Sequence, residues 1–362
     1  MAEKKIMTVC GSIEPDKLGL TSMHDHIMFD GSFMRRQFMS KGINHAFPIH
    51  ENDKVSLENV GILHRNTLLA WDALKQDDEK ALTEELALFK RAGGSAILEL
   101  SVPGVRLDPA AIQRISEKTD VYVIVSTGFY SADSWPQGLH GQSVDHYVSY
   151  MMREIEEGVA GTKIKPGHLK IALQYLNADE EKALRAAARV GAETGMSLTV
   201  HPCRQAGGAG HRILDIVEEE GLMPERVVMA HAVFTDKPNF AHAIKHPEDF
   251  RVNIAPMREL LDRGANISKE FLNPMAMELN GDYDDGDWSE MSGLVKLIGE
   301  GYAGQIVLGN DCRAKIALHQ FGGEGYCRML YYTLPMLRNV AGLADYALRQ
   351  MTIDNPARIL AF

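Results

Sequence analysis

The chain has 362 residues, of which 45% are hydrophobic, and its formal net charge at pH 7 is -11. This composition predicts a globular protein with a sizeable core, and the acidic balance argues against nucleic acid or an anionic membrane as a partner. No apolar stretch approaches the roughly 18 residues that a membrane helix needs. The four cysteines are scattered without a CxxC pair, and the charged segment 1–7 lacks an apolar signal core. A reducing, cytoplasmic location is therefore expected.

Residues 5–20 have the pattern of a β-hairpin, and residues 20–27 that of a first interior strand. The stretch from residue 31 to about residue 75 is irregular, which is typical of a long functional loop. From residue 78 onward, amphipathic helices alternate with short apolar strands. The further strands are expected at 95–100, 121–125, 168–173, 197–201, 227–231, 250–254 and 305–311. The helices are expected at 79–91, 109–118, 144–157, 180–194, 212–220, 240–246 and through most of 326–362.

Eight apolar strands separated by helices indicate a parallel sheet that is covered by helices. With no evident linker, they predict a single (β/α)₈ barrel domain over residues 1–362, with an N-terminal hairpin and long βα loops. The alternative is an open, doubly wound sheet. Such a sheet normally has a glycine-rich turn after its first strand, where this chain has His24-Asp25-His26.

Metal-binding side chains recur where the predicted strands end, and this is the rim at which barrels carry their chemistry. Alternation along a strand points two of them, His24 and His26, to the same side. Each has an ordinary structural explanation when taken singly, but equivalent positions in separate units favour a metal site. Four histidines and an aspartate exceed the three protein ligands of one open catalytic zinc. The residues are His24 and His26 (strand one), His201 (strand five), His231 (strand six) and Asp311 (strand eight), with Lys170 inside strand four.

Two ions close together need a bridging anion, and Lys170 as an ordinary lysine is a cation. The residues alone therefore do not supply the bridge. A lysine stem buried in the barrel wall, with its head paired to a carboxylate, is the plain alternative for this position.

Several motifs along nearly the whole chain resemble those of one known family. They are Thr8-Val9, Gly11, Ile13, Leu18-Gly19, Thr21, His24 and His26; Thr127-Gly128-Phe129-Tyr130; Gly161 to Gly167 with Lys170; His201-Pro202; His231; Asp311; Gly322-Gly323, Gly325-Tyr326; and Asn355 to Arg358. Together they resemble the phosphotriesterase family of the amidohydrolase superfamily.

This resemblance implies a site with two divalent metal ions, zinc first, with manganese, cobalt or iron as alternatives. It implies that His24, His26 and Asp311 bind the more buried ion, and that His201 and His231 bind the outer one. Lys170 matches a position that family members fill with an N-carboxylated lysine or a glutamate, and a carbamate would be the missing bridge. Relatives are often dimers, so the resemblance also implies a homodimer.

The chemistry that follows is hydrolysis by a metal-bridging hydroxide. Asp311, beside this nucleophile, would accept its proton. Tyr130 matches a tyrosine that faces the metals in lactone-hydrolysing relatives, although an aromatic side chain packing at a strand end is an equal explanation.

The leading hypothesis is a metal-dependent hydrolase of a small ester, with a lactone, including a sugar lactone that carries an anionic group, as the first candidate. Arg204, Arg258 and Arg313 fall in predicted rim loops and would suit a carboxylate or phosphate, although a solvated surface position is the slightly better explanation for any single one of them. The same site would serve a phosphotriester, a phosphonate ester or an N-acyl amide. A hypothesis of another class is a non-catalytic barrel that binds a small molecule. Such a protein would be recognised by the loss of one of the metal-binding side chains.

The chain also departs from the family pattern. Asp25 stands where glutamate is usual and, as a strand neighbour of two candidate ligands, should point away from them. The residues after His231 lack the usual acidic pattern, and the predicted seventh strand ends at Ile254 without an acidic residue. The acidic run at 282–287 is either a loop over the site or a solvated insertion.

Overall fold

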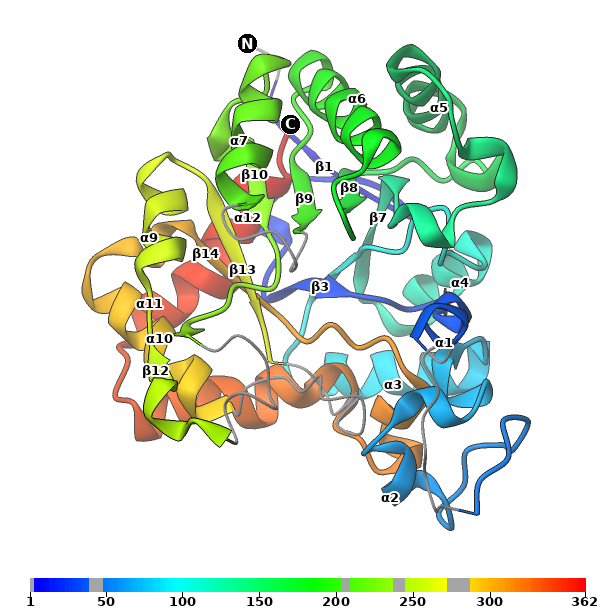
Figure 1. The fold of residues 1–362 in the computed structure, drawn as a ribbon, viewed down its shortest axis with the longest axis vertical. Helices are drawn as coiled ribbons and strands as arrows, with labels where there is room; N and C mark the ends of the chain where they lie inside the picture. Colours follow the sequence, from blue (N-terminus) through cyan, green and yellow to red (C-terminus); the bar gives the residue numbers. More distant parts are fainter. Residues whose placement is uncertain (1–2, 39–47, 203–208, 237–244, 272–286) are drawn as a thin grey trace.

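The computed structural model describes residues 3–38, 48–202, 209–236, 245–271 and 287–362. Its centre is an 8-stranded sheet in the order β14-β13-β10-β9-β8-β7-β6-β3, surrounded by helices (Figure 1). The backbone N–H groups of Asn310 and Asp311 donate to the carbonyl oxygen of His24 over 3.2 and 2.8 Å. These bonds join the two outermost strands, β14 and β3, so the sheet is nearly closed. The fold is the predicted (β/α)₈ barrel.

The barrel strands and the helices follow one another in the expected order. The strands are β3 Thr21–Asp25, β6 Ala96–Glu99, β7 Tyr122–Phe129, β8 His168–Ala172, β9 Leu198–His201, β10 Val227–Met229, β13 Asn266–Glu270 and β14 Ile306–Gly309. The α-helices after the first strand and its loop are α3 Glu79–Arg91, α4 Pro109–Thr119, α5 Val144–Glu157, α6 Ala178–Thr194, α7 Ala209–Glu219, α9 Ala255–Asp262, α10 Asp287–Gly299, α11 Asp345–Arg349 and α12 Asn355–Leu360.

Local sequence signals explain where the helices begin. The Asp78 side chain accepts from the backbone N–H groups of Lys80 and Ala81 and thereby starts α3. Asn177 and Glu180 form a capping box at the start of α6. Each helix lays its apolar face on the strands, whose aliphatic side chains are almost all fully buried. This packing fixes the strand ends, and therefore the side chains that follow them.

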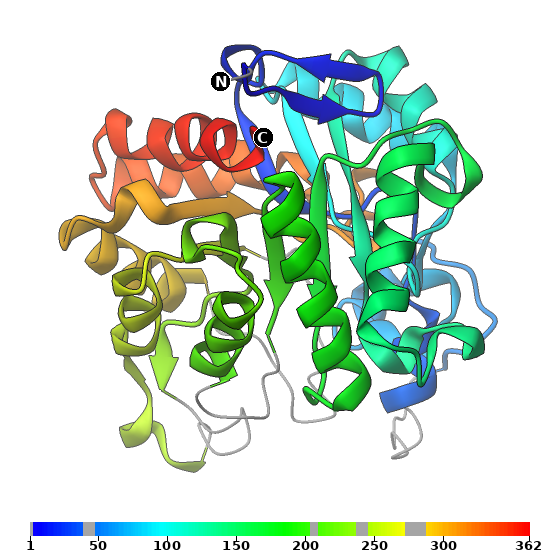
Figure 2. The same ribbon diagram turned by 90° about the horizontal axis from the view of Figure 1, so that it is seen from above.

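The segments outside the barrel repeat also agree with the sequence. The N-terminal hairpin consists of β1 Ile6–Thr8 and β2 Gly11–Ile13. The irregular stretch contains short elements: α1 Ser32–Phe38, α2 Val60–Leu63, and the strand pair β4 Phe29–Asp30 and β5 Lys75–Gln76. Lys5 and Phe362 exchange two backbone hydrogen bonds of 3.1 Å, so the two ends of the chain lie side by side (Figure 2).

The predicted seventh strand at 250–254 is wrong. Arg251–Val252 forms β12, which pairs antiparallel with β11, Thr235–Asp236, outside the barrel. The seventh barrel strand is β13, with the sequence NISKE, and it pairs parallel with β10 and β14. Only one residue of β13 is aliphatic, so hydrophobicity did not reveal it. Of the helix expected at 240–246, residues 240–244 lie outside the described residues.

None of the helices in the described part of the chain combines the length and the apolar character that a membrane crossing requires.

Candidate metal centre

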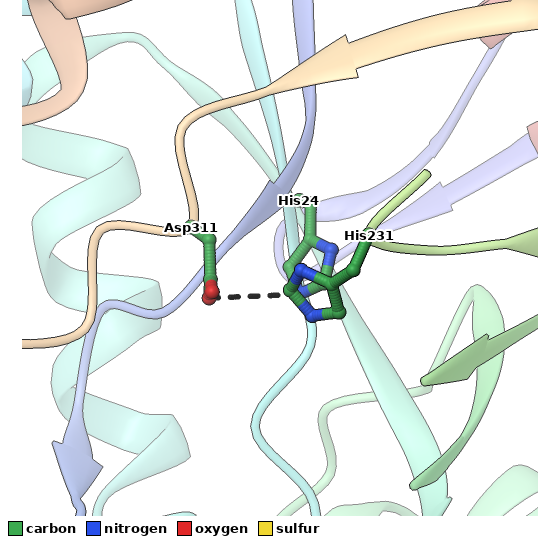
Figure 3. Close-up of side chains that lie close together, drawn as sticks. All are labelled: His24, His231 and Asp311. Atoms are coloured by element: carbon green, nitrogen blue, oxygen red, sulfur yellow. Dashed lines mark ion pairs between the residues drawn. The ribbon is translucent and has the colours of Figure 1, made fainter. Parts of the chain in front are cut away.

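Three potential metal ligands meet at the C-terminal end of the barrel strands. His24 lies on β3, while His231 and Asp311 each lie two residues beyond the ends of β10 and β14. One ligand atom from each lies within 4.8 Å of the others (Figure 3). The Nε2 atom of His24 is 3.6 Å from Oδ1 of Asp311. The structure thus brings together residues that are up to 287 positions apart in sequence.

His26 joins this group from the residue after β3. Its Nε2 atom lies 3.2 Å from Oδ1 of Asp311, the same oxygen that His24 approaches. The other ring nitrogen of each histidine is occupied: Nδ1 of His26 is 2.9 Å from Oγ of Ser101, and Nδ1 of His24 is 2.8 Å from Oε1 of Glu270. Such partners fix the tautomer and aim Nε2 at a metal. The predicted HxH geometry is therefore present.

His201 and Tyr130 lie next along the rim. His201 ends β9, and its ring centroid is 4.3 Å from that of His231. Tyr130, which follows β7, is buried with its ring centroid 6.3 Å from that of His201 and 5.5 Å from that of Phe33. The four imidazoles therefore form a continuous row from His26 through to His201, with an aromatic wall beside it.

Lys170 lies in the middle of β8 and is completely buried. Its Nζ atom has no hydrogen-bond partner among the described residues. Burial lowers the pKa of its amine to about 8, against the opposing attraction of Asp311 and Glu270. Among the described residues, no carboxylate therefore pairs with its head, in contrast to the plain alternative.

The charge state of the centre suits metal binding. Burial lowers the pKa of His24 and His26, and it lowers that of His231 to about 4. These imidazoles are therefore neutral near pH 7, which is the form that binds metals. Burial opposes the charge of Asp311, but the guanidinium of Arg313 and a hydrogen bond with His26 stabilise the carboxylate and hold its pKa well below the usual range.

Two of the candidate ligands occupy left-handed backbone conformations, with φ of 56° at His231 and 49° at Asp311. Non-glycine residues persist there only where the surroundings hold them. Asp25 provides such support: its carboxylate accepts from the backbone N–H of Cys312 at 2.9 Å and from Nδ2 of Asn310 at 3.2 Å. Asn310 and Cys312 are the two neighbours of Asp311, so Asp25 holds the segment that carries Asp311.

The three arginines that were predicted to bind substrate do not lie together at the centre as far as the structure describes them. Arg204 lies outside the described residues. Arg258 lies on α9, before the seventh strand and not in a rim loop after it, and pairs with Glu300 at 3.6 Å. Arg313 forms an ion pair with Asp311 and is the arginine that the structure brings to the centre.

Glu270 is the residue at this centre that sequence reasoning missed. It ends β13, and it contacts both His24 and His231. The sequence signal was the alternation of Asn266, Ser268 and Glu270 with Ile267 and Lys269, which fits a strand with a polar inner face.

A barrel with histidines and an acid gathered at the ends of its strands defines a class, that of enzymes with a metal centre at the C-terminal rim. Comparison with known proteins gives the family of the chain. The model of the phosphotriesterase family matches residues 4–360, and the chain belongs to this family. It is accordingly a hydrolase.

The relatives match along nearly their full lengths. A phosphotriesterase-related protein of Nematostella vectensis is 27% identical, with 100% of each chain covered. The N-acetyltaurine hydrolase of Homo sapiens is 27% identical over 99% of this chain and 98% of its own. Among solved structures, a resiniferatoxin-binding protein from Rhodobacter sphaeroides is 28% identical, with a TM-score of 0.82 over 98% of this chain and 94% of that one.

Proposed function

We propose that this protein is a two-metal hydrolase that acts on a small substrate with an ester or amide carbonyl. The observation that carries the proposal is the fully buried Nζ of Lys170, which has no hydrogen-bond partner among the described residues and interacts electrostatically with Asp311, a member of the ligand cluster with His24 and His231. A buried amine without a partner is costly, and its presence beside metal-binding side chains needs a chemical reason.

Carboxylation supplies that reason. The neutral amine of Lys170 adds to the carbon of carbon dioxide: a C–N bond forms, one C–O π bond breaks with its electron pair going to oxygen, and the nitrogen releases one proton, so a neutral amine becomes an anionic carbamate. This anion would lie between two cations, with His24, His26 and Asp311 around one ion. His201 and His231 would bind the other. Neutral imidazoles with carboxylates suit zinc first, and also manganese, cobalt or iron.

When bound, the two cations would activate a water molecule and polarise the carbonyl of the substrate. The chain's own groups do the rest. Asp311 would accept the proton of the attacking water, while Arg313 restrains the carboxylate from its other side. Tyr130, with Phe33 packed against it, would form an aromatic wall next to His201 that limits the access of water.

Removal of the metals should abolish hydrolysis. We expect protein treated with a strong chelator and then dialysed to lose its activity, and to regain it on addition of Zn²⁺ or Mn²⁺ together with bicarbonate. Bound metal per chain and initial rate would be measured on the same samples. Activity that survives complete metal removal would exclude the metal mechanism.

Two carbonyl classes compete as the substrate. A lactone is the expectation from the family resemblance, but its anionic form depended on a cluster of three arginines, of which the two that the structure describes are divided: Arg313 lies at the centre and Arg258 does not. An N-acyl amide of a small anionic amine is favoured by the full-length similarity to N-acetyltaurine hydrolases. We therefore place the amide first and the lactone second.

A substrate panel separates these classes. We expect kcat/KM for N-acetylated amino sulfonates or amino acids to exceed that for simple lactones by about tenfold or more, a difference of about 1.4 kcal/mol in transition-state binding. Paraoxon, as a phosphotriester, should be slower than both. Rates would be measured on zinc-loaded protein. A lactone that outperforms every N-acyl amide would reverse the order without affecting the metal mechanism.

A further inference from the structure

Glu270 presents one carboxylate to two candidate metal ligands. Its Oε1 atom lies 2.8 Å from Nδ1 of His24, and its Oε2 atom lies 3.2 Å from Nδ1 of His231. The backbone N–H of His231 also donates to Oε2, at 2.7 Å. The carboxylate is almost completely buried, with 1% of the side chain exposed. Each of its two oxygens thus contacts a different histidine.

This arrangement differs from the support of the neighbouring ligand. The Nδ1 atom of His26 contacts Ser101, a neutral hydroxyl group that serves this one histidine. Glu270 instead serves His24 on β3 and His231 after β10, which stand on opposite sides of β13 and β14 in the strand order. The carboxylate of Glu270 also accepts a hydrogen bond from the hydroxyl group of Ser268, and this bond within β13 restrains its orientation.

The contact with the His231 backbone adds a second constraint. His231 has a left-handed φ of 56°, so its position depends on what holds its main chain. The same oxygen of Glu270 that approaches its ring also accepts from its N–H group. Loss of this oxygen would release both the ring and the peptide that carries it.

We propose that Glu270 is a positioning residue that couples the two metal sites, because it orients one histidine of each ion. The inference rests on the proposed two-metal centre, in which His24 and His231 belong to different ions. A carboxylate that accepts from a ligand histidine fixes its tautomer and raises its basicity. One residue would therefore set the affinity of both ions, and neither site would be complete without it.

The test is metal binding to the metal-free protein, with activity not used as the readout. Zn²⁺ would be titrated against a chromophoric chelator to obtain the stoichiometry and both dissociation constants. In the variant Glu270→Gln the negative charge is lost and one accepting oxygen becomes a donor. We expect both ions to bind about 10- to 100-fold more weakly, as is usual when such a partner is lost.

Glu290→Gln is the matched control. Glu290 is also a buried carboxylate, with 6% of its side chain exposed, and it pairs with Lys269, the neighbour of Glu270 that points to α10. We expect this variant to melt at a lower temperature but to bind two zinc ions with unchanged affinities. If Glu270→Gln fails to fold, Glu270→Asp is the second variant. Its shorter side chain withdraws the carboxylate from both histidines, so we expect both ions to bind more weakly to it as well.

The outcomes are distinct. Wild-type affinities in Glu270→Gln, a loss confined to one ion, or an equal loss in Glu290→Gln would each overturn the coupling role. A wild-type protein that binds fewer than two ions would instead contradict the two-metal centre itself.

Discussion

Lys170→Ala is expected to lose the two-metal centre and with it nearly all hydrolysis. Alanine cannot supply an anion between the two metal ions, and two cations so close together repel strongly. The metals supply several kcal/mol of transition-state stabilisation, and each 1.4 kcal/mol is tenfold in rate. We therefore expect kcat/KM to fall by about 10³-fold or more, measured with metal content on the same preparation.

Two comparisons make this result specific to a bridging anion. Short carboxylic acids added to Lys170→Ala should partly restore both metal content and rate. Lys170→Glu carries a carboxylate of its own, so it should bind two metals without bicarbonate, whereas the wild type should need bicarbonate after metal removal. If Lys170→Ala retained two metals per chain and full activity, the bridging role would be wrong.

The sequence predicted the histidines of the centre from two kinds of signal. His201 ends β9 and His231 follows β10, and both strands carry the apolar side chains by which a strand is recognised. His24 lies on β3, whose sequence TSMHD is mostly polar, and there the spacing of His24 and His26 was the signal. Because a parallel barrel brings the C-terminal ends of all its strands to one rim, their convergence followed from strand order alone. Their ring contacts bear this out.

Glu270 could not be placed in the same way, because its strand carries a polar inner face. Ser268 and Glu270 face the barrel interior, and Lys269 on the other face is held by Glu290 of α10. A search for apolar residues misses such a strand and finds the more apolar segment at 250–254 instead. Because the seventh strand was predicted too early in the chain, Arg258 was predicted to follow it in a rim loop, whereas Arg258 precedes β13.

Gly128 explains a further motif that the sequence could mark only by resemblance. It lies on β7 opposite Lys170 of β8, and its φ is 134°. A Cβ atom at this position would lie 1.9 Å from the carbonyl oxygen of Lys170 and 2.9 Å from its carbonyl carbon. Backbone atoms cannot swing away as the end of a side chain can. The absence of a side chain at Gly128 therefore allows β7 to approach the main chain of Lys170.

Gly128→Ala should consequently be among the most damaging single-methyl changes in the barrel. Overpacking costs about 1–3 kcal/mol and a left-handed or otherwise strained backbone about 1–3 kcal/mol more, so we expect a loss of about 2–6 kcal/mol. Urea unfolding of the metal-free protein measures this loss independently of metal binding. Gly299→Ala, whose added Cβ would meet nothing within 4 Å, is the control and should change stability by about 0.5 kcal/mol or less. If the Gly128 variant were as stable as this control, the close approach of β7 to Lys170 would be incorrect, and with it the geometry on which the bridging position depends.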